Sequence, residues 1–365
     1  MTAQLEAPAT GATREVKGSR RTLKTWGSGL VSADVFESGL APFGDTAAVV
    51  VLDRAEHWPR LLDSGVVGAD SRVFVPRAED SGPSPLVMGY EGSLSDPGGE
   101  VQVGASFFLQ TQDYGTSEYL SLIGATLVRV VDEADLETFL DDADRARTTG
   151  VFPEFLTHHL VALCDVPALG GRYAEDGPSL RLFVDVNGAI STSPSGLRLG
   201  EVGDDFATLE KEWLRLNGAG ELPCSVCLGA AISDEVRVPA ITARPWLSRY
   251  HDAIAGIRHL RGREIGFDHE IQVSGFGARM TPELADVDAP ADDRSGAPTL
   301  LWTADAAFVH SPLTDRVFRL EREAGAVVER LMVHGSVDAA AGPVPEETLL
   351  QVRDFFARAG LPLCD

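Results

Sequence analysis

The last part of the chain has the most regular pattern of apolar and polar positions. Short apolar or alternating runs, separated by turn-forming residues, predict strands over residues 300–302, 306–310 and 316–320. The apolar period then becomes helical, and Gly335 follows where a helix favours a residue with positive φ. A second helical pattern begins near Pro345 and ends before Gly360. Residues 299–365 are therefore predicted to form three strands followed by helices.

The first half of the chain alternates apolar runs with amphipathic segments. The runs predict strands over residues 46–52, 72–76, 105–110 and 126–131. The amphipathic segments predict helices over residues 54–67, 117–123 and 133–147. Strands that alternate with helices indicate an α/β layer with at least partly parallel strands. No phosphate-binding loop follows any of these runs, so the pattern does not by itself indicate a nucleotide site.

The pattern changes near residue 151. Asn187 and Gly188 lie between two β-rich runs, which is a strong hairpin signal. Further helical patterns occur over residues 152–164, 205–217 and 245–261. An acidic segment rich in proline and glycine, residues 286–298, is typical of a linker.

These patterns divide a chain of 365 residues, which is long enough for two or three domains. Residues 1–22 are small, polar and aperiodic, and are predicted to be a disordered tail. An α/β domain over residues 23–150 and an α+β domain with the hairpin over residues 151–285 are expected to form the body. The linker at residues 286–298 then leads to the module of residues 299–365. The expected fold class is α+β overall.

The net charge and the lengths of the apolar runs argue against two classes of partner, nucleic acids and membranes. The formal net charge of −24 argues against a nucleic-acid surface, because phosphate binding depends on clustered Lys and Arg. No run reaches the roughly 18 apolar residues that cross a bilayer, and the first residues lack the apolar core of a signal peptide. We therefore expect a cytoplasmic protein with neither nucleic acid nor membrane as a partner.

The cysteines offer a candidate metal site. Cys224 and Cys227 form a CxxC pair, but a tetrahedral zinc site needs four ligands. Cys164 with either His158 or His159 would complete a Cys3His set. The candidate structural zinc site is therefore Cys164, Cys224, Cys227 and His159, and the alternative is a set of ordinary thiols with no cofactor. A disulfide framework is not expected in a large chain without a secretion signal.

The sequence carries no recognised catalytic set. It has no CxxxCxxC, which excludes radical-SAM chemistry on ligand count. It also lacks the HExxH pattern of zinc proteases and a G-x-S-x-G nucleophile elbow. We therefore do not expect an enzyme.

The order of three strands and then helices resembles the PqqD-like RiPP recognition element, a winged-helix module that binds the leader segment of a ribosomally made precursor peptide. The matching stretches are the strand ending VFRL, the helix AGAVVERLMVHG and the final LLQVRDFFARAGLP. That family has a middle helix, whereas here SVDAAAGPV is interrupted by Gly342 and Pro343. The middle helix must therefore be a single turn or absent.

The resemblance implies a binding site. In the family, the leader adds as a strand beside the third strand of the module and packs on its last helix, so that main-chain hydrogen bonds supply affinity. The matching positions of this chain are Val317, Phe318 and Arg319 on the strand, and Leu349, Leu350, Arg353, Phe356 and Ala357 on the helix. For the apolar positions the alternative interpretation is that they belong to the core.

The layout, a body followed by such a module, resembles the stand-alone recognition proteins of daptide biosynthesis. That resemblance implies a non-catalytic protein that presents a leader peptide to tailoring enzymes, namely an aminotransferase, an oxidative decarboxylase and a methyltransferase. The alternative hypothesis is a peptide-modifying enzyme, an oxidoreductase or a metal-dependent transferase, with a fused recognition element. The acidic charge disfavours a third hypothesis, a transcription factor.

Overall fold

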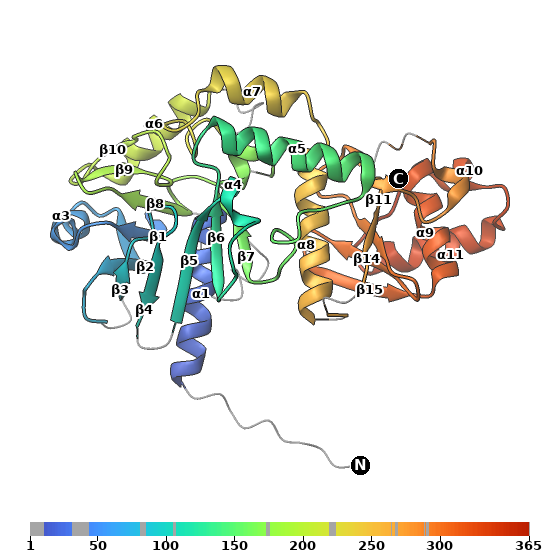
Figure 1. Cartoon of the computed structure of the whole chain (residues 1–365), viewed down its shortest axis with the longest axis horizontal. Helices are drawn as coiled ribbons and strands as arrows, with labels where there is room; N and C mark the ends of the chain where they lie inside the picture. The colour runs from blue at the N-terminus through green and yellow to red at the C-terminus, as the bar shows by residue number, and fades with distance from the viewer. Residues whose placement is uncertain are drawn as a thin grey trace, which may run out of the picture.

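The computed structural model has two β-sheets with the long helix α8 (Leu247–Arg263) between them (Figure 1). The fold mixes helices and strands and is α+β overall. The structure describes residues 11–30, 44–80, 85–104, 107–172, 176–218, 224–263, 265–266, 269–287, 289 and 292–364. Across these ranges, no helix has both the length and the apolar character that crossing a membrane requires.

The larger sheet has ten strands within the described residues, in the order β10-β9-β8-β1-β2-β3-β4-β5-β6-β7. The strands are β1 (Ala47–Leu52), β2 (Val67–Pro76), β3 (Leu86–Gly92), β4 (Glu100–Val103), β5 (Phe107–Asp113), β6 (Ala125–Arg129), β7 (Val161–Leu163), β8 (Arg181–Val184), β9 (Ala189–Ser191) and β10 (Gly200–Glu201). Strands β8, β1, β2 and β3 run parallel, as do β5, β6 and β7, and the antiparallel strand β4 joins the two groups. Every residue of β1 is buried, as expected for a strand covered on both faces.

The two parts that the sequence divided near residue 151 share this sheet. Strand β8, from the second part, pairs with β1 from the first, and β7 pairs with β6. The predicted hairpin at Asn187 and Gly188 is confirmed, since β8 and β9 are antiparallel neighbours. Residues 23–150 and 151–285 therefore build one sheet with a common core rather than two separate layers.

The first described element corrects one expectation. Residues 11–22 are not a disordered tail but the first part of helix α1 (Gly11–Ser28), while residues 1–10 lie outside the described residues. Helix α1 contacts β1, β6 and β7, strands that are far apart in the sheet order, so the sheet curls around it. Leu23 and Trp26 are buried, and Trp26 Nε1 donates to the Leu182 carbonyl at 3.0 Å. The helix escaped prediction because other buried positions, such as Thr22 and Thr25, are polar.

The other helices that precede β13 in the described residues are short or of moderate length. They are η1 (Ala55–His57), α3 (Trp58–Asp63), α4 (Tyr114–Ser117), α5 (Glu133–Thr149), η2 (Val166–Leu169), α6 (Phe206–Asn217), α7 (Asp234–Thr242) and η3 (Pro282–Leu284). The predicted helix over residues 133–147 is confirmed as α5, which begins at the side-chain cap Asp132 and ends at Gly150 with φ +75°. Helices α6 and α8 are also confirmed.

Two other helix predictions were wrong, and for one of them strand pairing overrode the local pattern. The helix predicted over residues 152–164 is a series of turns followed by β7, which pairs with β6. The helix predicted over residues 117–123 is absent, since α4 ends at Ser117. Strands β3 and β4 and helix α7 were not anticipated.

The smaller sheet has five strands among the described residues, in the order β12-β11-β13-β14-β15. Its elements are β11 (Gln272–Ser274), β12 (Gly277–Ala278), β13 (Thr299–Trp302), β14 (Ala307–Ser311) and β15 (Arg316–Leu320), followed by α9 (Arg322–His334), α10 (Val337–Ala340) and α11 (Glu346–Arg358). The three predicted strands and both long helices are confirmed, and α10 is the expected single turn. Helix α8 packs on one face of the sheet, and α9 to α11 pack on the other (Figure 1).

The sheet reaches beyond residues 299–365, because β11 and β12 precede the segment expected to be a linker. The described residues of that segment are tied to their surroundings. Asp292 is paired with Arg279, and the Gly296 N–H donates to Asp252 Oδ2 at 3.2 Å. The smaller sheet thus packs against the body through α8, and the segment expected to be a linker is itself bonded to its surroundings.

Helix α1 should contribute strongly to stability. We predict that Trp26→Ala lowers the free energy of unfolding by about 3–5 kcal/mol, because it removes a large buried side chain from inside the curled sheet. The exposed residue Arg21 on the same helix provides the control, and Arg21→Ala should change stability by less than about 1 kcal/mol. Urea unfolding measures both. Equal, small effects would mean that α1 is not part of the core.

Candidate functional site

Strand β15 forms an open edge of the smaller sheet. Among the described strands its only partner is β14, and the pairing runs from Ser311 opposite Arg316 to Ala307 opposite Leu320. The other end of the sheet, at β12, lies against α5 of the body. An edge strand presents unpaired backbone N–H and C=O groups to which another chain can bind.

The side chains of β15 alternate between the two faces of the sheet. Phe318 and Leu320 pack against the core formed with α9 and α11, whereas Val317 packs against the core shared with the body. Arg319 is exposed. The two larger apolar side chains of the edge, Phe318 and Leu320, thus face helices α9 and α11.

That flank contains a hollow of about 180 Å³, bounded by β15, α9 and α11. We call it the β15 groove, and it is lined by Leu320, Ala324, Val328, Gln351, Val352, Phe355 and Phe356. Phe355 is one of these lining residues and is 50% exposed. An apolar hollow beside an edge strand can accept an apolar side chain of a strand that pairs with that edge.

Aromatic contacts hold the groove in shape. The Phe318 ring meets Phe356 edge-on with centroids 5.3 Å apart, and Phe355 meets Phe356 in the same way at 5.1 Å. The Arg316 guanidinium lies over the Phe318 ring at 5.1 Å and donates to the Ala359 carbonyl at 3.0 Å. These contacts fix the C-terminal end of α11 against the start of the edge strand.

The structure places the predicted peptide-binding residues in different surroundings. Phe318 and Phe356 lie in the aromatic cluster, and Phe356 lines the groove although it is only 1% exposed. Leu349 is wholly buried, and Leu350 is partly buried against the same core.

Two predicted helix positions lie away from the groove lining. Arg353 is paired with its neighbour Asp354 at 2.7 Å, and Ala357 is exposed. The prediction missed Phe355, Val352 and Ala324, which do line the groove. The helical spacing of these residues places them on the helix faces that point toward β15. That spacing could be interpreted only after both helices had been placed against the strand.

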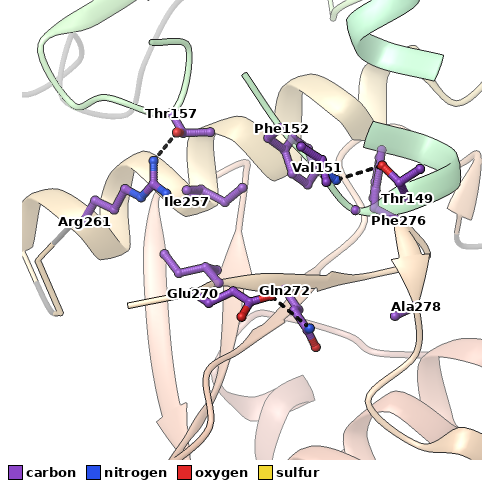
Figure 2. Close-up of a pocket in the computed structure, with 12 residues that line it drawn as sticks. Thr149, Val151, Phe152, Thr157, Ile257, Arg261, Glu270, Gln272, Phe276 and Ala278 are labelled. Atoms are coloured by element: carbon purple, nitrogen blue, oxygen red, sulfur yellow. Dashed lines mark hydrogen bonds between the residues drawn. The ribbon is translucent and has the colours of Figure 1, made fainter. Parts of the chain in front are cut away.

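A second hollow lies where the body meets the smaller sheet (Figure 2). It measures about 250 Å³ and is bounded by residues near the end of α5, by α8 and by β11. Its polar side chains bond to one another, since Arg261 donates to Thr157 Oγ1, and Gln272 donates to Glu270 at 3.4 Å. These groups are engaged with each other and do not converge on a common point within the hollow.

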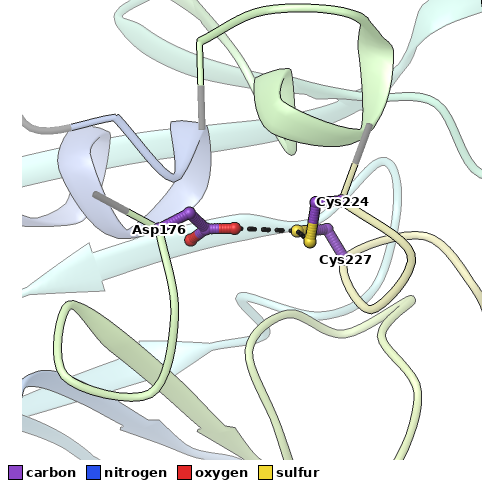
Figure 3. Close-up of side chains that lie close together, drawn as sticks. All are labelled: Asp176, Cys224 and Cys227. Atoms are coloured by element: carbon purple, nitrogen blue, oxygen red, sulfur yellow. Dashed lines mark hydrogen bonds between the residues drawn. The ribbon is translucent and has the colours of Figure 1, made fainter. Parts of the chain in front are cut away.

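The CxxC pair lies deep in the body (Figure 3). Cys224 and Cys227 have their sulfur atoms 2.8 Å apart, and the Cys227 sulfur lies 2.9 Å from Asp176 Oδ2. Neither Cys164 nor His159 belongs to this group of ligand atoms, although both are described. The structure thus brings together two of the four predicted ligands, Cys224 and Cys227. It also places the Asp176 carboxylate beside them, which the sequence did not predict.

Arg181 occupies the remaining space beside the pair. Its side chain is fully buried and donates to Asp176 Oδ1 and Asp165 Oδ1, each at 2.9 Å, and to the Cys227 sulfur at 3.3 Å. Burial raises the pKa of the Cys227 thiol well above its ordinary value. A zinc ion would need thiolates and a fourth ligand where this cation now lies. Zinc binding by the CxxC pair therefore stays a prediction, with an ion-pair network as its competitor.

The buried network should be sensitive to loss of its cation. We predict that Arg181→Leu lowers the free energy of unfolding by about 3–5 kcal/mol, because it leaves two buried carboxylates without their cation. Arg198, which pairs with Glu201 on the surface, is the matched control, and Arg198→Leu should cost less than about 1 kcal/mol. Comparable losses in chemical denaturation would show that the network contributes no more than a surface pair.

Comparisons of the chain with models of known families, with curated proteins and with solved structures found no match. The candidate site therefore depends on the geometry of the open β15 edge and the β15 groove.

Proposed function

We propose that this chain is a non-catalytic peptide-binding protein that takes an extended leader segment of a precursor peptide as an additional strand beside β15. The observation that supports the proposal most is the combination of an open edge strand with an apolar groove along its flank. The edge supplies backbone hydrogen bonds, and the groove accepts side chains.

The dimensions of the edge limit the guest. Strand β15 has five residues, so a paired segment of similar length would be about 17 Å long. Alternate side chains of an extended peptide point to the same face. We therefore expect apolar residues at every second position of the guest, with at least one large side chain resting against Phe355. Burying such a side chain contributes about 1.5–3 kcal/mol.

The body has a supporting role in this proposal. It holds the smaller sheet through α8 and offers surfaces on which tailoring enzymes dock while the leader is held. By resemblance, these enzymes are an aminotransferase, an oxidative decarboxylase and a methyltransferase. An exposed apolar loop is consistent with such contacts, since Tyr119 is 82% and Ile123 is 72% exposed.

Binding can be tested with fluorescein-labelled peptides corresponding to candidate leaders, by fluorescence polarisation. We predict that Phe355→Asp weakens binding of the cognate leader at least about tenfold, because it puts a charge in the lining of the apolar groove. Leu214→Asp, at a position on α6 that is 56% exposed, is the matched control and should leave affinity unchanged. Phe356 is unsuitable, since a charge at a buried position would test folding instead of binding.

Circular dichroism must show that the Phe355→Asp protein is folded. A folded variant that binds as tightly as the original chain would remove the groove from the site. If none of the leaders bound the original chain, the proposed function itself would fail.

A further inference from the structure

A histidine pair and a carboxylate converge where α8 meets the smaller sheet. His259 comes from α8, His310 from β14, and Asp315 from the turn between β14 and β15. Asp315 Oδ1 lies 3.0 Å from His259 Nδ1 and 3.2 Å from His310 Nε2. All three ligand atoms lie within 4.8 Å of one another.

The backbone around this cluster is shaped to bring the side chains together. Helix α8 has a glycine, Gly256, where it faces the His310 ring, and a Cβ there would lie 3.2 Å from His310 Nδ1. Asp315 adopts a φ of +51°, a conformation that is uncommon outside glycine. Arg172 of the body donates to the Pro312 carbonyl at 2.9 Å and so fastens the turn that carries Asp315.

The separations between the ligand atoms are those of hydrogen bonds and lie close to the spacing that a zinc ion requires. In a tetrahedral zinc site with nitrogen and oxygen ligands at about 2.0–2.2 Å, the ligand atoms are about 3.3–3.5 Å apart. The two observed separations of 3.0 and 3.2 Å lie just below that range. Two imidazoles and one carboxylate form a known donor set for zinc with an open fourth position.

Solvent reaches the cluster from the side of Asp315. The side chains of His310 and His259 are 1% and 8% exposed, whereas that of Asp315 is 41% exposed. An ion would thus be held from the inside by two fixed imidazoles and approached from solvent past the carboxylate. Water or an incoming side chain would take the fourth position.

We propose that His259, His310 and Asp315 form a binding site for one divalent transition-metal ion of the zinc class. The site lies at the turn that opens β15, so a bound ion would fix the start of the edge strand. It is separate from the β15 groove, and its existence does not depend on peptide binding.

The hydrogen bonds of the cluster without an ion bear on the affinity with which it would bind one. Without metal, the Asp315 carboxylate accepts from both rings, so these three side chains have hydrogen-bond partners even when no ion is bound. With metal on Nε2, the proton of His310 moves to Nδ1, which has no hydrogen-bond partner among the described residues. Zinc-bound histidines usually have such a partner. We therefore expect reversible binding that chelators remove without unfolding the protein.

The test uses the full chain after chelator treatment, with Zn(II) titrated calorimetrically and Co(II) as a spectroscopic probe. The original chain should bind one Co(II) with visible d–d bands and no thiolate charge-transfer band. His259→Gln and Asp315→Asn should each weaken this binding at least about tenfold. The exposed His269, which lies outside the cluster, provides the control His269→Gln, which should bind as the original chain does.

A fourth variant, Cys224→Ser, separates this site from the CxxC pair and should leave the d–d signal intact. The proposal is overturned if the original chain binds no ion, or if His259→Gln and Asp315→Asn bind as tightly as the original chain. It is also overturned if the only signal is a thiolate charge-transfer band that disappears in Cys224→Ser.

Discussion

The smaller sheet is covered on both faces, and this burial determines where the molecule can accept a partner strand. Helix α8 lies on one face and α9 to α11 on the other, so apolar side chains of β13 and β14 are removed from water on both sides. At one end of the sheet β12 meets the body, which leaves β15 as the open edge within the described part of the chain. Backbone groups at such an edge bind water unless another strand pairs with them.

Helix α8 packs against the body on one side and against the smaller sheet on the other, and so connects the two. On its body side, the Tyr250 ring stacks on Phe152 at 5.8 Å and meets Phe139 of α5 at 5.9 Å. On its other side, Arg249 donates to the Pro298 carbonyl at 2.9 Å, immediately before β13. Because these contacts fix the sheet to the body, a peptide held at β15 would have a defined position relative to any enzyme docked on the body.

Features set by neighbouring residues could be predicted from the sequence, and features set by distant ones could not. The hairpin at Gly188, the end of α9 at Gly335 and the three strands of the module follow from local chemistry. Helix α1 was missed because small polar residues such as Thr22 form part of its buried face. The groove was only partly anticipated, since Phe355 lines it through the packing of α11 against β15. The convergence of His259 with His310 and Asp315 depends on how α8 crosses the sheet, which no local pattern encodes.

Hydrogen–deuterium exchange of the backbone amides, with and without a bound leader peptide, tests the central claim most directly. If the peptide adds to the sheet, the amides of β15 that point away from β14 should exchange more slowly in the complex, because each gains a hydrogen-bond partner. Slower exchange should also appear in α11 around Phe355. Binding that leaves exchange in β15 unchanged, or that protects only segments of the body, would contradict strand addition at this edge.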